Sequence, residues 1–288
     1  MARLLGIAGI QMNVMPGEDN TRSMLAKLDT VRALAPWVDL IFFSELCACG
    51  LSKKQSGPIP NPALDRFCRW ATDHAKWLIP GSWYEQSHDR LYNTAIAIAP
   101  DGTIEARYRK IFPWRPLEES AAGEEFCVFD IPGKGRIGLC ICYDQWFPEV
   151  ARSLAWMGAE AVICPTATST PDRSREIVMA RAAAIANQMY WLSLNGLGAG
   201  GIGQSVFFDP QGTLLQQGGE GERIMTEIID LDLVDRTRKF GTAGECQVWK
   251  SFAGFRTRFP VYHQDGSQGA ILKTLDPLQV YKKLDEEH

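Results

Sequence analysis

Short apolar runs alternate with segments of helical spacing along most of the chain, and this alternation restricts the fold more than any other feature. In the first half, the strand candidates are Leu4–Gln11, Val38–Phe43, Trp77–Gly81 and Leu91–Ala99, and the helix candidates are Asp19–Leu34 and Ala63–Ala75. In the second half, the strand candidates are Gly135–Tyr143, Ala161–Thr166 and Tyr190–Leu194, and the helix candidates are Pro148–Met157 and Arg173–Gln188. Strands that alternate with helices predict an α/β protein.

Two hairpin patterns, one in each half of the chain, resemble each other. Residues 95–104 and 205–214 each read as an apolar run, then Pro-(Asp or Gln)-Gly-Thr, then a second run. Proline fixes the first turn position and glycine supplies a positive φ. The repetition predicts two similar layers packed on each other. Because no linker separates the halves, we predict one domain over residues 1–260, and we expect the less periodic tail 261–288 to pack on a neighbouring subunit.

The charge and the apolar pattern argue against several classes of function. The chain of 288 residues has a formal net charge of −4, without the basic excess of a nucleic-acid-binding surface. No apolar stretch approaches the length of a membrane span, and Met1-Ala2-Arg3 leads directly into a strand candidate rather than a signal peptide. We therefore expect a cytoplasmic protein with no nucleic-acid or membrane partner, whose eight cysteines are thiols.

Cys142 stands at the end of the strand candidate Gly135–Tyr143, shortly before Pro148, which suits the first turn of a helix. Alternation with a period of two would place Cys140 and Cys142 on one face of this strand. A thiol on a strand-to-helix turn is presented to a crevice, where backbone N–H groups can face a developing oxyanion. Cys142 is therefore a candidate nucleophile, although an isolated cysteine is more often a buried apolar side chain.

Metal binding and disulfide redox chemistry are the other chemical uses of these cysteines. Cys47 and Cys49, like Cys140 and Cys142, are separated by one residue, whereas structural zinc sites favour two to four. The histidines, at positions 74, 88, 263 and 288, do not complete a ligand set. A disulfide between residues two apart on one strand face would be strained. We therefore predict no metal site and disfavour a redox function.

Two other strand ends carry charged side chains. Glu45 follows the apolar run at residues 40–43, and Lys110 precedes the aromatic-rich residues 111–114. Ligands of open α/β sheets sit beyond the carboxyl ends of the strands. A carboxylate there would take the thiol proton as general base, and an ammonium would lower the thiol pKa and stabilise an oxyanion. Taken singly, Glu45, Lys110 and the nearby Glu118 would more often be solvated charges.

Together these segments resemble the nitrilase superfamily of carbon–nitrogen hydrolases. The matching pieces are Phe43–Glu45, Tyr108–Trp114, Gly138–Asp144 and Phe147–Glu149, followed by Arg181–Ala184, Asn187-Gln188, Asn195, Gly203–Ser205 and the turn Pro210–Gly212. The resemblance implies a four-layer αββα sandwich that assembles as a homodimer or higher homo-oligomer. It further implies that Glu45 is the general base, Lys110 stabilises the oxyanion and Cys142 is the nucleophile.

Residues 109–118 look most like the aliphatic amidase and formamidase branch of this superfamily. There the glutamate that ends the motif is a fourth catalytic-site residue that positions the substrate, and here it matches Glu118. Residues 119–123 depart from the branch, which typically has glycine after that glutamate. We predict that Trp114, Tyr143, Thr166 and Asn195 contact the substrate. Three arginines could read an acidic substrate group, although each is more often a surface charge: Arg115, Arg173 and Arg175.

The predicted function is hydrolysis of a small carboxamide to a carboxylate and ammonia, through a thioester on Cys142. The predicted partners are the amide and water, without a metal or organic cofactor. A nitrile hydrolase or an N-carbamoyl hydrolase would use the same three residues and stays open as an alternative. A non-catalytic binding or sensor protein with the same fold is the alternative from another class.

Overall fold

The computed structural model describes residues 2–257 and 259. The strands of the first sheet are β1 (Leu4–Gln11), β3 (Leu40–Phe43), β4 (Trp77–Ile79), β5 (Ser82–Ser87), β6 (Arg90–Ile98), β7 (Ile104–Arg109) and β15 (Arg223–Asp230). They lie in the order β15-β1-β3-β4-β6-β5, and β7 also pairs with β6. The strands of the second sheet are β8 (Cys127–Ile131), β9 (Gly135–Leu139), β10 (Ala161–Thr166), β11 (Tyr190–Asn195), β13 (Val206–Phe208) and β14 (Leu214–Gln217).

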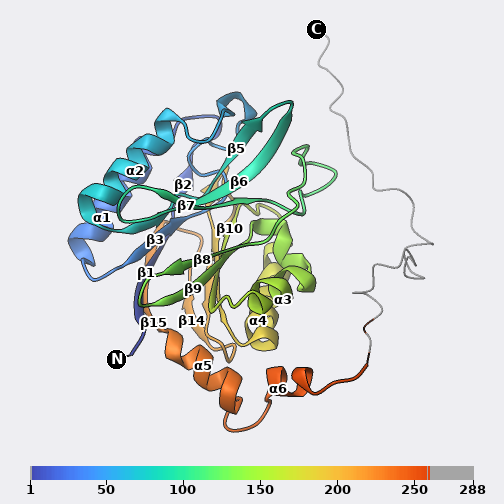
Figure 1. Ribbon diagram of the computed structural model, residues 1–288. Helices are drawn as coiled ribbons and strands as arrows, with labels where there is room; N and C mark the ends of the chain where they lie inside the picture. Colours follow the sequence, from blue (N-terminus) through green and yellow to red (C-terminus); the bar gives the residue numbers. More distant parts are fainter. Residues whose placement is uncertain (1, 258, 260–288) are drawn as a thin grey trace.

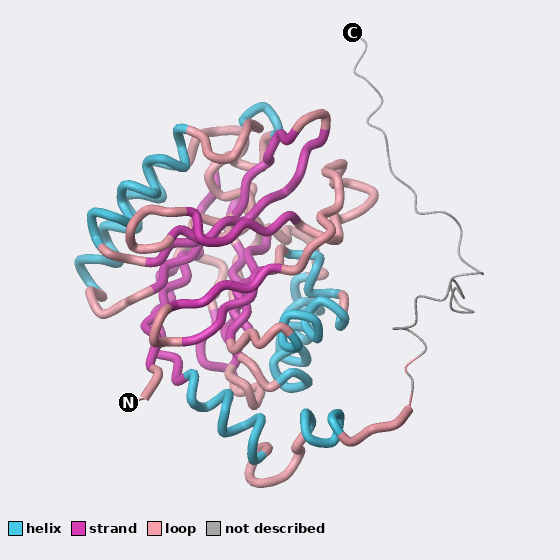
Figure 2. Tube along the Cα trace, viewed as in Figure 1, coloured by secondary structure: helices cyan, strands magenta, loops and turns pink. Residues whose placement is uncertain are grey.

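The second sheet has the order β14-β13-β11-β10-β9-β8, and two short strands, β2 (Asn13–Val14) and β12 (Leu197–Gly198), pair separately. The helices are α1 (Thr21–Leu34), α2 (Pro62–His74), α3 (Pro148–Trp156), α4 (Arg173–Asn187), α5 (Leu231–Phe240) and α6 (Val248–Ala253), with 3₁₀ turns η1 (Lys53–Gln55) and η2 (Cys142–Trp146). Figures 1 and 2 show the two sheets between α1 and α2 on one side and α3 and α4 on the other. The predicted four-layer αββα sandwich is confirmed.

The alternation of apolar side chains in β1 and β3 explains why these strands lie inside the sandwich. Leu5 and Ile7 of β1 belong to the core between the two sheets, which continues to α3 and α4. Ala8 and Ile10 of the same strand belong to the core under α1 and α2. Strands buried on both faces read as continuous apolar runs, which is how they are recognised in the sequence. Between the sheets, the rings of Phe42 and Phe207 have centroids 5.5 Å apart.

The parallel strands of the two sheets end on the same side of the molecule. In the first sheet β1, β3 and β4 are parallel, and in the second β9, β10 and β11 are parallel. The backbone N–H of Glu45, just beyond β3, donates to the carbonyl of Thr166 at the end of β10, with 3.3 Å between N and O. The carboxyl ends of the two sheets therefore meet, as a ligand site at strand ends requires.

Both predicted hairpins are present, as β6–β7 and β13–β14, with antiparallel pairing. Their turn glycines, Gly102 and Gly212, have φ of 85° and 81°. The strand predicted over Gly135–Tyr143 is too long, because β9 ends at Leu139 and Cys142 opens the 3₁₀ turn η2. The period-two argument that placed Cys140 and Cys142 on one strand face therefore does not apply.

The predicted domain boundary at residue 260 and the predicted tail 261–288 lie outside the described residues. Over residues 2–257 and 259, the structure contains no helix long and apolar enough to cross a membrane.

Candidate active site

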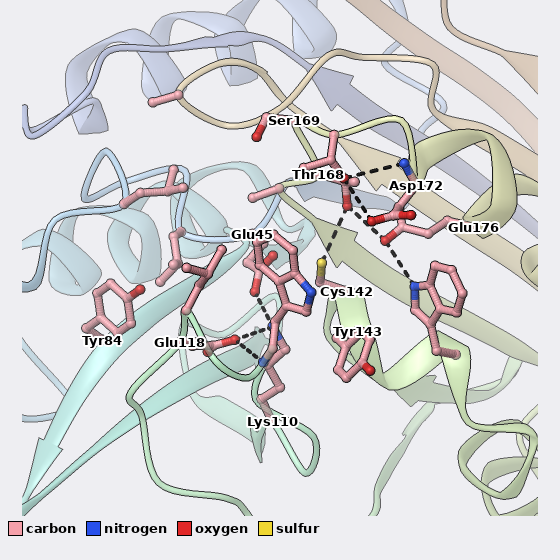
Figure 3. A pocket seen from close by; sticks show the side chains of 18 residues that line it. Glu45, Tyr84, Lys110, Glu118, Cys142, Tyr143, Thr168, Ser169, Asp172 and Glu176 are labelled. Carbon is pink, nitrogen blue, oxygen red and sulfur yellow. Dashed lines mark hydrogen bonds and ion pairs between the residues drawn. The ribbon is translucent and has the colours of Figure 1, made fainter. Parts of the chain in front are cut away.

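A cavity of about 390 Å³ opens at the carboxyl ends of the strands, between the two sheets (Figure 3). Its lining includes all four predicted catalytic residues together with aromatic, hydroxyl and acidic side chains: Glu45, Leu46, Leu51, Tyr84, Lys110, Trp114, Leu117, Glu118, Cys142, Tyr143, Trp146, Ala167, Thr168, Ser169, Thr170, Asp172, Glu176 and Ala199. Its volume falls within the range typical of small-molecule sites, about 300–1,000 Å³.

Cys142 lies on a tight turn rather than on a strand. Its φ is 47°, in the left-handed region that non-glycine residues seldom adopt. The Asp144 carboxylate holds this turn, since it accepts the Ile141 N–H at 2.9 Å, the Phe112 N–H at 2.8 Å and the Tyr108 hydroxyl at 2.7 Å. The same carboxylate thus ties the Cys142 turn to the segment that carries Lys110. Strained backbone that its surroundings enforce is common at functional sites.

Lys110 lies between two carboxylates. Its Nζ donates to Glu45 Oε1 at 2.9 Å and to Glu118 Oε2 at 2.7 Å. The amide nitrogen of Asn93, on β6, also donates to both carboxylates, at 2.8 Å to Glu45 and 3.0 Å to Glu118. The side chains of Lys110 and Glu45 are only 1% and 5% exposed, so the charges are almost removed from water and require this pairing.

Glu118 is fully occupied by hydrogen-bond donors. Besides Lys110 and Asn93, it accepts the backbone N–H of Trp114 at 2.9 Å and the hydroxyl of Ser120 at 2.8 Å. A carboxylate offers about four lone-pair positions, and four donors are present. Burial would raise the pKa of Glu118, but the charge and the hydrogen bond of Lys110 outweigh it and hold the pKa below its ordinary value.

Glu45 has the opposite electrostatic character. Burial raises the pKa of its carboxyl above the ordinary value, and the attraction of Lys110 does not cancel this effect. Burial alone would lower the pKa of Lys110, yet Glu45 and Glu118 together hold it well above its ordinary value. Two carboxylates on one ammonium therefore differ: Glu118 stays ionised, while Glu45 is the one suited to taking up and releasing a proton.

The thiol of Cys142 is neutral in this environment. Burial raises its pKa well above the ordinary value, the negative charge of Glu45 raises it further, and Lys110 opposes them only in part. Our expectation that Lys110 would lower the thiol pKa is therefore correct for the sign of its contribution and wrong for the net result. Glu45 lines the same cavity as the thiol and is the candidate base.

The four predicted substrate contacts divide into two pairs. Trp114 and Tyr143 line the cavity. Thr166 and Asn195 are fully buried and are not among the lining residues, so we correct their assignment. Thr166 Oγ1 donates to the Leu194 carbonyl at 3.1 Å. The Asn195 side chain hydrogen-bonds to both the backbone N–H and the backbone carbonyl of Thr168. Their role is to shape the loop after β10.

None of the three candidate arginines is among the residues that line the cavity. Arg173 is fully buried behind the cavity wall and pairs with Glu176, with 3.2 Å between Nη1 and Oε2. Arg175 is exposed and pairs with Asp172 at 2.7 Å. Arg115 donates to the carbonyl of Ser120 at 2.6 Å.

Several residues of the site were missed in the sequence. Asn93 interrupts the apolar residues of β6, and this buried polar position was the available signal. Thr168 and Glu176 gave no comparable signal, since a hydroxyl in a loop and a glutamate in a helix are ordinary. Among residues 2–257 and 259, no group of histidine, cysteine, aspartate and glutamate side chains is arranged to hold a metal ion.

Solved structures share this fold. Nit3 of Saccharomyces cerevisiae, described as a member of branch 10 of the nitrilase superfamily, has a TM-score of 0.74 and 24% identity, covering 82% of this chain and 94% of that one. A variant of the amidase from Nesterenkonia sp. AN1, solved with the acetamide moiety of fluoroacetamide added covalently at its active-site cysteine, has a TM-score of 0.70 and 23% identity, covering 83% and 94%. Both structures therefore share the αββα architecture of this chain.

The sequence match is more specific than the fold. Residues 7–239 match the family model of the carbon–nitrogen hydrolases. The formamidase of Bacillus thuringiensis (strain Al Hakam) is 32% identical over 237 residues, which cover 77% of this chain and 70% of the relative. That of Bacillus cereus (strain Q1) is 33% identical over 233 residues, covering 75% and 69%. The chain belongs to the carbon–nitrogen hydrolase family, enzymes that act on C–N bonds other than peptide bonds.

Proposed function

We propose that the protein is an amidase that hydrolyses a small, uncharged carboxamide through a thioester on Cys142. The observation that carries this proposal is the position of Lys110, held between Glu45 and Glu118 on a cavity that also exposes the thiol. The printed function of the relatives, formamidase, supports the choice of an amide. The covalent adduct in the Nesterenkonia amidase supports the choice of a cysteine as nucleophile on this fold.

In the first half-reaction, the sulfur of Cys142 attacks the amide carbon while the Glu45 carboxylate takes the thiol proton. The carbonyl oxygen becomes an oxyanion. Lysine has three N–H donors, and two of those on Lys110 already go to carboxylates, which leaves one for the oxyanion. The backbone N–H of Tyr143 is the second proposed donor. Collapse then breaks the C–N bond, Glu45 returns the proton to the leaving nitrogen, and ammonia departs.

In the second half-reaction, water replaces ammonia and the same groups act again. Glu45 takes a proton from water, the resulting hydroxide attacks the thioester carbon, and Lys110 again stabilises the oxyanion. The carbon–sulfur bond breaks, the proton on Glu45 returns to the sulfur, and the carboxylic acid leaves. One amide and one water thus yield one carboxylic acid and one ammonia. The raised pKa of Glu45 suits it to carry the proton in both halves.

Glu118 acts in this proposal by holding Lys110 rather than by binding the substrate. The reason is that its two oxygens already accept four hydrogen bonds. Its lowered pKa keeps it ionised, so that Lys110 stays charged and in place while Glu45 gains and loses its proton. This differs from the substrate-positioning role that the family resemblance implies.

The charge of the cavity wall favours neutral amides over N-carbamoyl amino acids. Among the described residues, Lys110 is the one basic side chain on the lining, and two carboxylates surround it. Asp172 and Glu176 add further negative charge on the opposite wall. A substrate carboxylate would meet acidic groups there, and the described part of the chain places no arginine on the lining to bind it.

A panel of matched substrates tests this assignment. We expect ammonia release from propionamide, with kcat/KM at least about tenfold lower for succinamate, which adds a carboxylate to the same amide. Propionitrile and N-carbamoylglycine should be poorer still. A higher kcat/KM for N-carbamoylglycine than for propionamide would contradict the substrate class, and no ammonia from any of the four would contradict the amidase assignment.

We also propose that the chain forms a homo-oligomer. Apolar side chains are exposed on the outer helices of the second sheet: Trp156 on α3, and Val178 and Ile185 on α4, are 69%, 65% and 47% exposed. Exposed apolar side chains that gather on one face are typical of an interface. The cytoplasmic location stays a prediction.

A further inference from the structure

A second chain of hydrogen bonds reaches Cys142 from the side opposite Glu45 and Lys110 (Figure 3). The hydroxyl oxygen of Thr168 lies 3.6 Å from the sulfur. The same hydroxyl lies 2.9 Å from Glu176 Oε1, to which it donates. Both side chains line the cavity and are almost fully buried. The two half-reactions derived above use neither of them.

The number of protons available in this series of hydrogen bonds decides whether Thr168 or Cys142 is the donor in their contact. A threonine hydroxyl has one proton and two lone pairs. A carboxylate only accepts, so the bond between Thr168 and Glu176 uses that one proton. Toward the sulfur, Thr168 can then only accept, and the thiol must be the donor.

Glu176 is kept as an acceptor by its other neighbours. Arg173 Nη1 donates to its second oxygen at 3.2 Å, and the indole N–H of Trp146 lies 3.4 Å from the first. Arg173 is itself fully buried and also donates to Ser193 Oγ at 3.0 Å, so its guanidinium has little freedom to move. Both oxygens of Glu176 thus face donors other than Thr168.

The backbone of Thr168 is held just as firmly. Its N–H donates to Asn195 Oδ1 at 2.8 Å, and its carbonyl accepts from Asn195 Nδ2 at 3.0 Å. The Asn195 amide donates further to the Gly203 carbonyl at 2.9 Å. Asn195 therefore fixes the position of the Thr168 hydroxyl relative to the sulfur, although it does not reach the cavity itself.

We propose that Thr168 and Glu176 are positioning residues that hold the Cys142 thiol protonated and oriented in the resting enzyme. The thiol has one proton, which the contact with Thr168 uses in the resting enzyme and which Glu45 takes in the proposed reaction. Proton transfer to Glu45 during attack must therefore break the contact with Thr168. The inference rests on the proposed function in one respect, namely that Glu45 is the base that finally receives this proton.

The charges around the sulfur agree with this role. After burial, Glu45 and Glu176 both raise the pKa of the Cys142 thiol, and Lys110 lowers it. Glu45 comes from the loop after β3, Lys110 from the end of β7 and Glu176 from α4. The thiol is thus flanked by one negative charge on each side and one positive charge, and the resting form is the neutral thiol.

Replacing Thr168 should change the reactivity of the Cys142 thiol and the rate of amide turnover in opposite directions. Thr168→Val keeps the shape but removes the acceptor, so the neutral thiol loses a hydrogen bond and the thiolate forms more readily. We expect iodoacetamide to modify Cys142 about fivefold faster near neutral pH, followed at the Cys142 peptide by mass spectrometry. Amide turnover should instead fall about tenfold, because the sulfur is no longer oriented. Thr168→Ser restores the hydroxyl and should bring both values back toward those of the unmodified enzyme.

Replacing Glu176 should reverse the donor and the acceptor in the hydrogen bonds of the Thr168 hydroxyl. In Glu176→Gln, the buried Arg173 requires an acceptor, so the amide oxygen turns to Arg173 and the amide nitrogen donates to Thr168. The Thr168 proton is then free to point at the sulfur and stabilise the thiolate. We expect alkylation of Cys142 roughly thirtyfold faster near neutral pH, a larger effect than that of Thr168→Val.

The outcomes separate this inference from the amidase proposal, because alkylation requires no substrate. Thr170→Val, which removes a neighbouring hydroxyl of the lining that bonds to Asp172, is the matched control and should not change the alkylation rate. Unchanged or slower alkylation in both Thr168→Val and Glu176→Gln would overturn the proposed role of Thr168 and Glu176, even if amides are hydrolysed. Faster alkylation in these variants, combined with no amide hydrolysis by the unmodified enzyme, would support that role and contradict the proposed function. Should Thr168→Val fail to fold by circular dichroism, Glu176→Gln decides.

Discussion

Cys142→Ala should lower amide hydrolysis on the order of 10⁵-fold, to the limit of detection, because no other group in the cavity can form the thioester. The backbone at Cys142 adopts a left-handed conformation, with φ of 47°, and the sulfur lies on the cavity lining. Among the residues that the structure describes, no neighbouring side chain is placed to act in its stead. Alanine removes one atom from a side chain that is 9% exposed, so the fold should persist. Ammonia release from propionamide, with circular dichroism on the same sample, checks both expectations.

Cys140→Ala is the matched control for this experiment. Cys140 is two residues away and fully buried, it is not on the cavity lining, and its thiol interacts with Cys164. It should retain turnover within a few-fold, since the change is small and touches no reacting group. Full activity in Cys142→Ala, or loss of activity in Cys140→Ala with the fold intact, would contradict the assignment of the nucleophile.

Glu45→Gln should lower kcat about a thousandfold, the range of a lost general base. Glutamine keeps the volume and one acceptor for Lys110 and Asn93, so the loss would reflect proton transfer rather than collapse of the site. Both half-reactions depend on this carboxylate, and a neutral thiol cannot attack efficiently without it. Steady-state kinetics with a saturating amide measures the effect.

The pH profile of the unmodified enzyme provides an independent check on Glu45. The carboxyl must be ionised to accept the thiol proton, so activity is lost as the pH falls through its pKa. Because burial raises that pKa above the ordinary value near 4.5, the acid limb of kcat/KM should lie above this value. The limb reports the coupled group of Glu45, Lys110, Glu118 and Cys142 rather than one residue alone. A limb at or below pH 4.5 would argue against Glu45 as the base.

The sequence was sufficient for the features that depend on local pattern. The bounds of β1 and β10 and the positions of both hairpins are as predicted, because alternating apolar residues and proline–glycine turns act over a few residues. Glu45, Lys110 and Cys142 stand out by their positions at strand ends, and the family resemblance adds the αββα architecture and the assignment of Glu118. The cavity brings all four together, although they are spread over almost a hundred residues of sequence.

Features that depend on distant partners could not be predicted. β9 ends early because Asp144 folds back on Ile141 and also bonds to Phe112 and Tyr108. The sequence favours a surface position for Arg173, yet it is buried against Glu176 and Ser193, which come from different elements.

Electrostatics was the least predictable property of the site. The sign of the effect of Lys110 on Cys142 follows from charge alone, but the net pKa of the thiol depends on burial, which only the folded chain defines. The same holds for the contrast between Glu45 and Glu118. Both are carboxylates on one lysine, and they differ because Glu118 collects four donors while Glu45 is left with fewer.

The most direct test of the central claim is the mass of the enzyme during turnover. Mixing it with propionamide and quenching in acid should trap a fraction of the molecules carrying one propionyl group, and peptide mapping should place that group on Cys142. The signal should disappear with Cys142→Ala and on treatment with hydroxylamine, which cleaves thioesters. Ammonia released at an undiminished rate with no acyl group on Cys142 at any quench time, or an acyl group on another residue, would contradict the account.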